Sequence, residues 1–172
     1  MRILTVFFSR ADENWIEGTL RYISAGNTET VCRKIEKMIN TDVFRIEMKQ
    51  PYSRDYKTCT IQANQDLKTN ARPELICLLE GMEQYDTIIL AYPNYWGTIP
   101  MPVVPFLLSF DLSDKTILPL CTHEGSGMGS SENDIRKYAP GARLMHGLSI
   151  IGSHVKQADA LIEAWLKTNG II

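Results

Sequence analysis

The sequence predicts a single α/β domain in which a parallel sheet carries helices on both faces. Two observations lead to this fold class. Strand-length apolar runs alternate along the chain with segments whose apolar residues recur at helical spacing. The composition, with 44% hydrophobic and 22% charged residues, is that of a globular protein and excludes disordered, collagen-like and coiled-coil chains. The 172 residues suit one core, and no repeat or compositional break divides residues 1–172 into two domains.

Five apolar runs are predicted as strands: residues 3–8, 43–48, 87–92, 116–121 and 144–150. The first run is continuous and rich in β-branched and aromatic residues, which is typical of a parallel strand buried on both faces. The second run alternates apolar and polar residues, which indicates a strand near the edge of the sheet. Pro119 lies inside the fourth run and has no N–H to donate, so it argues against regular pairing there.

Helices are predicted over residues 27–39, 103–110, 130–138 and 157–167, with a short helix from about residue 60 to residue 69. We expect the first of them to begin at Asn27, a common capping residue, and Glu29 suits the positive end of the helix dipole. Its apolar side chains recur every three or four residues, at Val31, Ile35, Met38 and Ile39.

Charge and targeting features exclude several classes of protein. The 18 Lys and Arg residues against 20 Asp and Glu residues give a net charge of −2, and no basic stripe is present, which argues against nucleic-acid binding. The first apolar run is too short for a signal peptide, and no stretch of about 18 apolar residues predicts a membrane span. The four cysteines show neither Cys-x-x-Cys nor zinc spacing. We therefore expect a soluble cytoplasmic protein with free thiols.

Ligands of open α/β sheets bind beyond the carboxyl ends of the strands, so the segments that follow the strands are the candidate site. The first such segment combines Ser9 and Arg10 with Gly26, Asn27 and Thr28. Hydroxyl groups, an amide and the free N–H groups of a helix start are suited to holding a phosphate, and a glycine permits close approach. A helix cap followed by a turn explains the same residues equally well.

Two further segments offer an aromatic surface and accessible backbone groups. Tyr95 and Trp96 follow a buried strand, between Asn94 and Gly97, and offer a surface on which a planar ring stacks, although they could simply cover the end of the sheet. Residues 122–129 are rich in glycine, so their backbone groups could line the edge of a flat heterocycle. Their glycine spacing differs from the G-x-G-x-x-G pattern of dinucleotide-binding proteins.

Together the three segments resemble the flavodoxin family, through Phe7-Phe8-Ser9-Arg10, Gly26-Asn27-Thr28-Glu29, Tyr92-Pro93-Asn94-Tyr95-Trp96-Gly97-Thr98 and residues 121–129 in that order. The resemblance implies a five-stranded sheet of order 2-1-3-4-5 and FMN as cofactor at its switch point. It implies cofactor-binding roles for Ser9, Arg10, Gly26, Asn27, Thr28, Pro93, Asn94, Tyr95, Trp96, Gly97, Thr98, Thr122, His123, Glu124, Gly125, Gly127 and Gly129. The first group would hold the phosphate, and the other two would flank the isoalloxazine ring.

The chain departs from the family pattern at residues 11–25, which are inserted where Ser-Arg usually runs almost directly into Gly-Asn-Thr. The insertion contains apolar residues, so we expect a small hairpin or helix that covers the phosphate, or an ordered flap without a role. In either case, a phosphate site requires Ser9 and Gly26 to meet across the insertion. Near the ring, Glu124 is expected to lower the flavin potential, and His123 to offset it.

The resemblance implies an FMN-binding redox protein that carries electrons between partner proteins. The alternative is an NAD(P)H-dependent FMN quinone or nitro compound reductase, because a charge of −2 is small for a carrier that docks through an acidic field. Redox partner proteins or a small electron acceptor are the expected partners, and the chain is expected to be a monomer or a homodimer. No side chain is predicted to act as a catalytic acid, base or nucleophile.

Rival classes lack essential residues. A phosphatase needs Cys-x5-Arg, but the sixth residue after Cys121 is Gly127, and the sixth after Cys32 is Met38. The G-x-S-x-G turn of a serine hydrolase would need glycine where Glu124 stands. His123 and Glu124 have no second pair at ligand spacing, so a metal site is not predicted.

Overall fold

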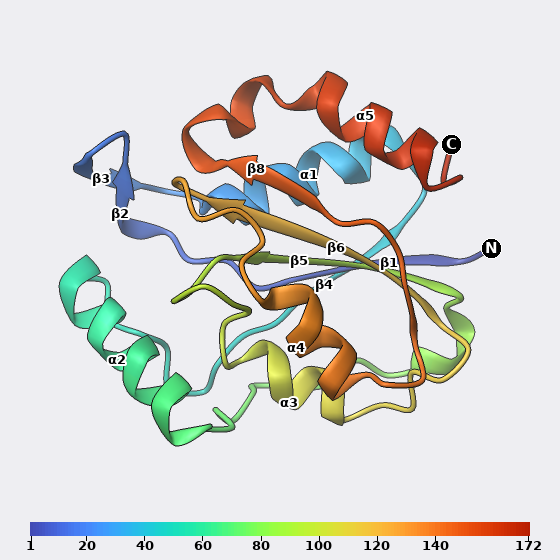
Figure 1. The fold of residues 1–172 in the computed structure, drawn as a ribbon, viewed down its shortest axis with the longest axis horizontal. Coiled ribbons are helices and arrows are strands. Elements are labelled where there is room, and N and C mark those ends of the chain that lie inside the picture. Colours follow the sequence, from blue (N-terminus) through green and yellow to red (C-terminus); the bar gives the residue numbers. More distant parts are fainter.

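The computed structural model describes residues 1–172 and contains a six-stranded parallel sheet between two helical layers (Figure 1). The spatial order is β4-β1-β5-β6-β7, and β8 also pairs with β6. In chain order the strands are β1 (Ile3–Phe7), β4 (Asp42–Arg45), β5 (Thr87–Pro93), β6 (Thr116–His123), β7 (Arg143–Leu144) and β8 (Leu148–Ile151). The α/β class and the parallel sheet are confirmed, and the order is 2-1-3-4-5 when β7 and β8 are counted as one strand.

The division of the predicted fifth strand explains how Pro119 is tolerated inside β6. The ladder to β7 ends at the pair of Ile117 with Leu144, and the ladder to β8 begins at the pair of Leu120 with Leu148. The carbonyl oxygen of Ile117 accepts a hydrogen bond from Met145 on this side of β6. Because backbone groups alternate between neighbours along a strand, Pro119 faces the same side, where the ladder is interrupted and its missing N–H breaks no regular pairing.

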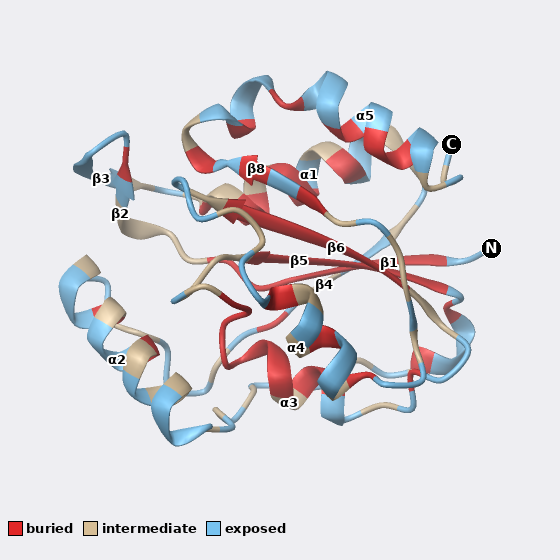
Figure 2. Ribbon diagram, viewed as in Figure 1, coloured by how far each residue is buried: buried red, intermediate tan, exposed pale blue.

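Each face of the sheet packs on its own pair of helices, and the central strands β1, β5 and β6 are buried (Figure 2). Helices α1 (Asn27–Met38) and α5 (Asp159–Thr168), with the 3₁₀ turn η2 (Gly152–Gln157), cover one face. Helices α3 (Val103–Leu108) and α4 (Ser131–Tyr138) cover the other, and η1 (Met82–Gln84) precedes β5. None of these helices is both long and apolar enough to cross a lipid bilayer.

Several predicted boundaries differ from the structure, and three of them have a local reason. The cap of α1 is Gly26 and not Asn27, so the cap residue has no side chain that could bond the first turn of the helix. Helix α2 (Tyr56–Thr69) begins four residues before the predicted start, because the Asp55 side chain accepts a hydrogen bond from the N–H of Thr58. The edge strand β4 ends at Arg45, and Met48 forms only an isolated bridge with Leu75.

The insertion at residues 11–25 forms a hairpin, one of the two structures expected for it. Strands β2 (Asp12–Ile16) and β3 (Thr19–Ile23) pair antiparallel, and the two residues between them, Glu17 and Gly18, have φ values of 51° and 77°. Positive φ at both positions is typical of the tight type I′ hairpin turn. The hairpin and α2 both lie beyond the carboxyl ends of the strands (Figure 1). Together they form two walls outside the sheet.

Candidate functional site

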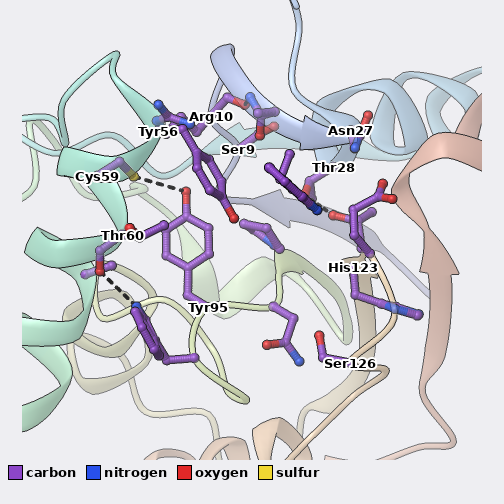
Figure 3. Close-up of a pocket in the computed structure, with 18 of the residues that line it drawn as sticks. Ser9, Arg10, Asn27, Thr28, Tyr56, Cys59, Thr60, Tyr95, His123 and Ser126 are labelled. Carbon is purple, nitrogen blue, oxygen red and sulfur yellow. Dashed lines mark hydrogen bonds between the residues drawn. The ribbon is translucent and has the colours of Figure 1, made fainter. Parts of the chain in front are cut away.

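A pocket of about 610 Å³ opens at the carboxyl ends of the strands, between the hairpin and α2 (Figure 3). This volume lies in the range usual for cofactor and small-molecule sites. Twelve of the seventeen predicted site residues line it: Ser9, Arg10, Asn27, Thr28, Pro93, Asn94, Tyr95, Trp96, Gly97, Thr122, His123 and Glu124. The three predicted segments therefore meet at one place.

The segments on either side of the insertion meet where the first predicted segment requires it. A Cβ atom on Gly26 would lie 2.1 Å from Ser9 Oγ and 2.6 Å from the carbonyl oxygen of Arg10, so only glycine fits. Ser9 Oγ accepts a hydrogen bond of 3.1 Å from the N–H of Glu29 in the first turn of α1. The N–H groups of Asn27 and Thr28 have no partner within the helix. The resulting cradle offers neutral donors beside the positive end of the α1 dipole.

Two buried threonine hydroxyls join this cradle to the end of β6. Thr28 Oγ1 lies 2.8 Å from Thr122 Oγ1, and both side chains are almost fully buried. The hydrogen bond fixes the distance between the first and third segments, and it satisfies each hydroxyl inside the protein.

We expect Thr28→Val to lower the free energy of unfolding of the apo-protein by about 1–3 kcal/mol, because it leaves the buried Thr122 hydroxyl without its partner. Thr28→Val/Thr122→Val should recover part of this loss, since it removes both polar groups together. Urea denaturation of the four proteins of this cycle measures both effects. Strictly additive losses would show that the two hydroxyls are independent.

The loop after β5 is held in a tight turn by its own backbone and by Asn94. Tyr95 and Thr98 bond to each other through N–H and carbonyl groups, and Trp96 and Gly97 between them have φ values of 55° and 83°. Asn94 Nδ2 donates to the Gly127 carbonyl (2.8 Å), and Asn94 Oδ1 accepts from the Gly97 N–H (2.8 Å). Asn94 thus joins the second and third segments.

The two aromatic residues of this turn lie in different environments. Trp96 is 55% exposed, and its indole N–H donates to the Thr60 carbonyl of α2 (2.9 Å). Tyr95 is partly buried against Phe8 and Tyr52, and burial raises the pKa of its hydroxyl. Trp96 therefore has the more accessible ring, and Tyr95 serves as part of the pocket wall.

Five predicted site residues do not line the pocket: Gly26, Thr98, Gly125, Gly127 and Gly129. They shape the loops that do. A Cβ atom on Gly129, whose φ is 56°, would lie 2.1 Å from the Gly97 carbonyl oxygen, so the third segment packs directly on the second. The Thr98 hydroxyl donates to the Asp134 carboxylate in α4. Gly125 N–H donates to Nδ1 of His123 (2.9 Å), and burial lowers the pKa of this imidazole.

Seven lining residues were not predicted: Asn14, Trp15, Tyr56, Cys59, Thr60, Ala63 and Ser126. Four of them come from α2 at helical spacing, so they form one face of that helix. The sequence signal that could have identified this face is the helix start at Asp55. Trp15 comes from the hairpin, and its ring is stacked with that of Tyr56 at a centroid distance of 6.3 Å.

Cys121 is a core residue, as its position at a strand end in an apolar run suggests. The side chain is fully buried, its Sγ atom lies 3.5 Å from the Gly127 carbonyl oxygen, and burial raises the pKa of the thiol to about 12. A thiol that stays protonated at neutral pH is a poor nucleophile. Both the sequence and the burial of Cys121 therefore argue against a cysteine-dependent phosphatase.

Comparison with known proteins assigns the family. A sequence model described as flavodoxin matches residues 19–169. The chain belongs to the flavodoxin family. No curated protein sequence matches it. The chain is similar in fold to a protein assigned as a flavoprotein, from Bacteroides eggerthii DSM 20697, with 23% identity over 97% of this chain and 96% of that one and a TM-score of 0.77.

Two more solved structures share the flavodoxin fold at lower identity. A flavoprotein in complex with FMN from Lactobacillus acidophilus NCFM is 16% identical, covers 91% of this chain and 97% of its own, and has a TM-score of 0.65. Oxidised Flavodoxin 2 from Bacillus cereus is 16% identical, with coverage of 98% and 99% and a TM-score of 0.51. Membership of the flavodoxin family makes FMN the cofactor of this chain, and the donor set of the pocket suits it.

Proposed function

We propose that this flavodoxin holds FMN in the pocket between the hairpin and α2 and uses it to pass electrons from a donor to an acceptor. The observation that carries the proposal is the meeting of Ser9 with Gly26 across fifteen inserted residues. This contact creates a cradle of neutral hydrogen-bond donors at the start of α1, next to a planar aromatic surface.

Each part of the pocket suits one part of FMN. Ser9 and Asn27 would bind the phosphate, together with the first N–H groups of α1, which include the N–H of Thr28. The backbone of residues 93–98 would lie along one edge of the ring, and that of residues 122–126 along another. Trp96 would contribute a stacking face, because its ring is accessible and its indole N–H is fixed on α2. When bound, FMN supplies the redox chemistry, and the chain orients it and sets its electrostatic surroundings.

Transfer between partner proteins is the role we propose first, because more than half of the Trp96 surface is exposed at the pocket mouth, where a partner could approach the cofactor. A reductase that acts on a small quinone or nitro compound is the second candidate. The observation that favours it is the second aromatic surface of Trp15 and Tyr56, which walls the mouth and is suited to a planar molecule.

We expect the purified protein to be yellow, with the absorbance of oxidised flavin, and the apo-protein to bind FMN at one site with sub-micromolar affinity. Fluorescence titration measures this, with riboflavin as the control that lacks the phosphate. Anaerobic mixing then separates the two roles: reduction only through a partner reductase supports the carrier, and direct NAD(P)H oxidation with a quinone supports the enzyme. A colourless protein that fails to bind added FMN would contradict the proposal.

A further inference from the structure

The side chain of Arg10 braces the two walls of the pocket. Its guanidinium group donates to three backbone carbonyl oxygens: Nε to Ser53 at 3.1 Å, Nη2 to Arg54 at 2.7 Å, and Nη1 to Glu13. These bonds join the segment after β1 to the hairpin and to the loop before α2. Arg10, predicted as a cofactor-binding residue, thus has most of its donors occupied by the protein itself.

The positive charge of Arg10 is not neutralised by a carboxylate. No Asp or Glu oxygen lies within 4.0 Å of its guanidinium nitrogens. Glu13 and Asp55 are acidic neighbours in the two braced segments, and Glu124 lines the same pocket, but none pairs with Arg10. A half-buried cation whose partners are all neutral carbonyls favours negative charge in the adjoining cavity.

The charge faces one side of the pocket. Figure 3 shows Arg10 between Ser9 and Tyr56, and Cys59 and Tyr95 lie on the Tyr56 side. Burial raises the pKa of Cys59 and of Tyr95, and the charge of Arg10 opposes that rise at both groups. The phosphate cradle at the start of α1 is built from other, neutral donors. The hydrogen bonds to Ser53 and Arg54, in the loop before α2, hold the guanidinium on the α2 side of the pocket, which Tyr95 of the loop after β5 also lines.

We propose that Arg10 raises the affinity of this protein for reduced FMN relative to its affinity for oxidised FMN, by stabilising the negative charge that reduction places on the ring. The proposal rests on the proposed function. A hydride donor transfers two electrons and one proton together to N5 of the neutral oxidised ring, and the product carries one negative charge, shared by N1 and the neighbouring carbonyl oxygen. A cation in a partly desolvated wall stabilises that product more than the neutral reactant. The negative charge of Glu124, which lines the same pocket, disfavours the reduced anionic ring.

The test compares dissociation constants for oxidised FMN and for FMN reduced with dithionite under anaerobic conditions. In Arg10→Gln we expect the affinity for reduced FMN to fall about tenfold more than the affinity for oxidised FMN. This change in ratio corresponds to a midpoint potential lower by about 30 mV for a two-electron couple. Arg10→Lys keeps the charge but cannot bond all three carbonyls, so it should weaken both affinities by a similar factor.

A second variant leaves the brace intact. Glu13→Gln removes an acidic group near Arg10, while its amide oxygen can still accept the hydrogen bond that the Glu13 carboxylate accepts from Tyr56 N–H (3.1 Å). We expect it to shift the affinity ratio about threefold toward reduced FMN. If Arg10→Gln does not fold, this variant decides, and an unchanged ratio in Glu13→Gln overturns the proposal.

Other outcomes identify which idea is wrong. Equal losses for both redox forms in Arg10→Gln would overturn the proposal and leave Arg10 as a brace only. So would an effect that disappears when riboflavin replaces FMN, because the charge would then act on the phosphate. A wild-type protein that binds neither form would overturn the proposed function itself, and this inference with it.

Discussion

Gly26→Ala is expected to remove most of the affinity for FMN and to destabilise the fold. The added Cβ atom would lie 2.1 Å from Ser9 Oγ and 2.6 Å from the Arg10 carbonyl oxygen, and backbone atoms must move to relieve the second contact. Overpacking of this kind costs about 1–3 kcal/mol of stability. Displacing two hydrogen bonds to a phosphate costs about 3 kcal/mol of binding free energy, which is about a hundredfold in affinity.

The matched control for this prediction is Gly141→Ala. Its Cβ atom would also be crowded, at 2.6 Å from Ser113 Oγ and 3.1 Å from Ser113 Cα, but neither residue lines the pocket. We expect a similar loss of thermal stability with unchanged FMN affinity in the folded protein. Isothermal titration at a temperature where both variants are folded measures the difference. Wild-type affinity in Gly26→Ala would contradict the phosphate cradle.

Shortening the hairpin is expected to accelerate the release of FMN by tenfold or more. The hairpin crosses the pocket mouth: the carboxylate of Glu13 accepts from Tyr56 N–H at its base, and at its tip Glu17 N–H donates to Glu124 Oε2 at 3.4 Å. Trp15 packs on Tyr56 between them, and such an aromatic pair contributes about 0.5–1.5 kcal/mol beyond its buried area. The hairpin thus runs from α2 to the end of β6 as one wall of the pocket, and shortening it would open that wall.

Replacing residues 15–20 with Asn-Gly would join Asn14 to Arg21, which are opposite each other in the present register. The carbonyl group that binds Arg10 is retained, so the brace should survive. Trp15→Ala and its cross-strand partner Leu20→Ala form a matched pair, because only Trp15 lines the pocket. Stopped-flow fluorescence gives the dissociation rates. An unchanged rate in the shortened protein would mean that the insertion is a flap without a role in binding.

The fold was predictable where local pattern and tertiary burial agree. The strand over residues 3–8 and the first helix needed only their apolar spacing. The break between β7 and β8 was not predictable, because residues 144–150 read as one apolar run. Gly147 lies in the break between β7 and β8. A Cβ atom on it would lie 3.1 Å from Pro119 Cγ on the neighbouring strand. Pro119 signalled irregular pairing, but the sequence did not show which neighbouring strand would be interrupted.

The residues that line the pocket were also only partly predictable from the sequence. Residues that follow strands were found, because the carboxyl ends of parallel strands meet at one edge. The α2 face that carries Tyr56 and Cys59 was missed: the cap at Asp55 could have indicated where the helix begins, but not that the helix lies beside the pocket, beyond the sheet edge. That the cap is Gly26 and not Asn27 has a tertiary cause too: the hydroxyl that bonds the first turn of α1 comes from Ser9, in the segment after β1.

The broken ladder beside Pro119 also bears on how copies of this protein behave in concentrated solution. A long, continuous outer strand offers a template on which a second chain can extend the sheet and start aggregation. Here that margin consists of two- and four-residue pieces, β7 and β8, and the opposite margin is the four-residue β4. Neither border presents enough consecutive unpaired groups to nucleate such growth, so self-association through sheet extension is disfavoured at both.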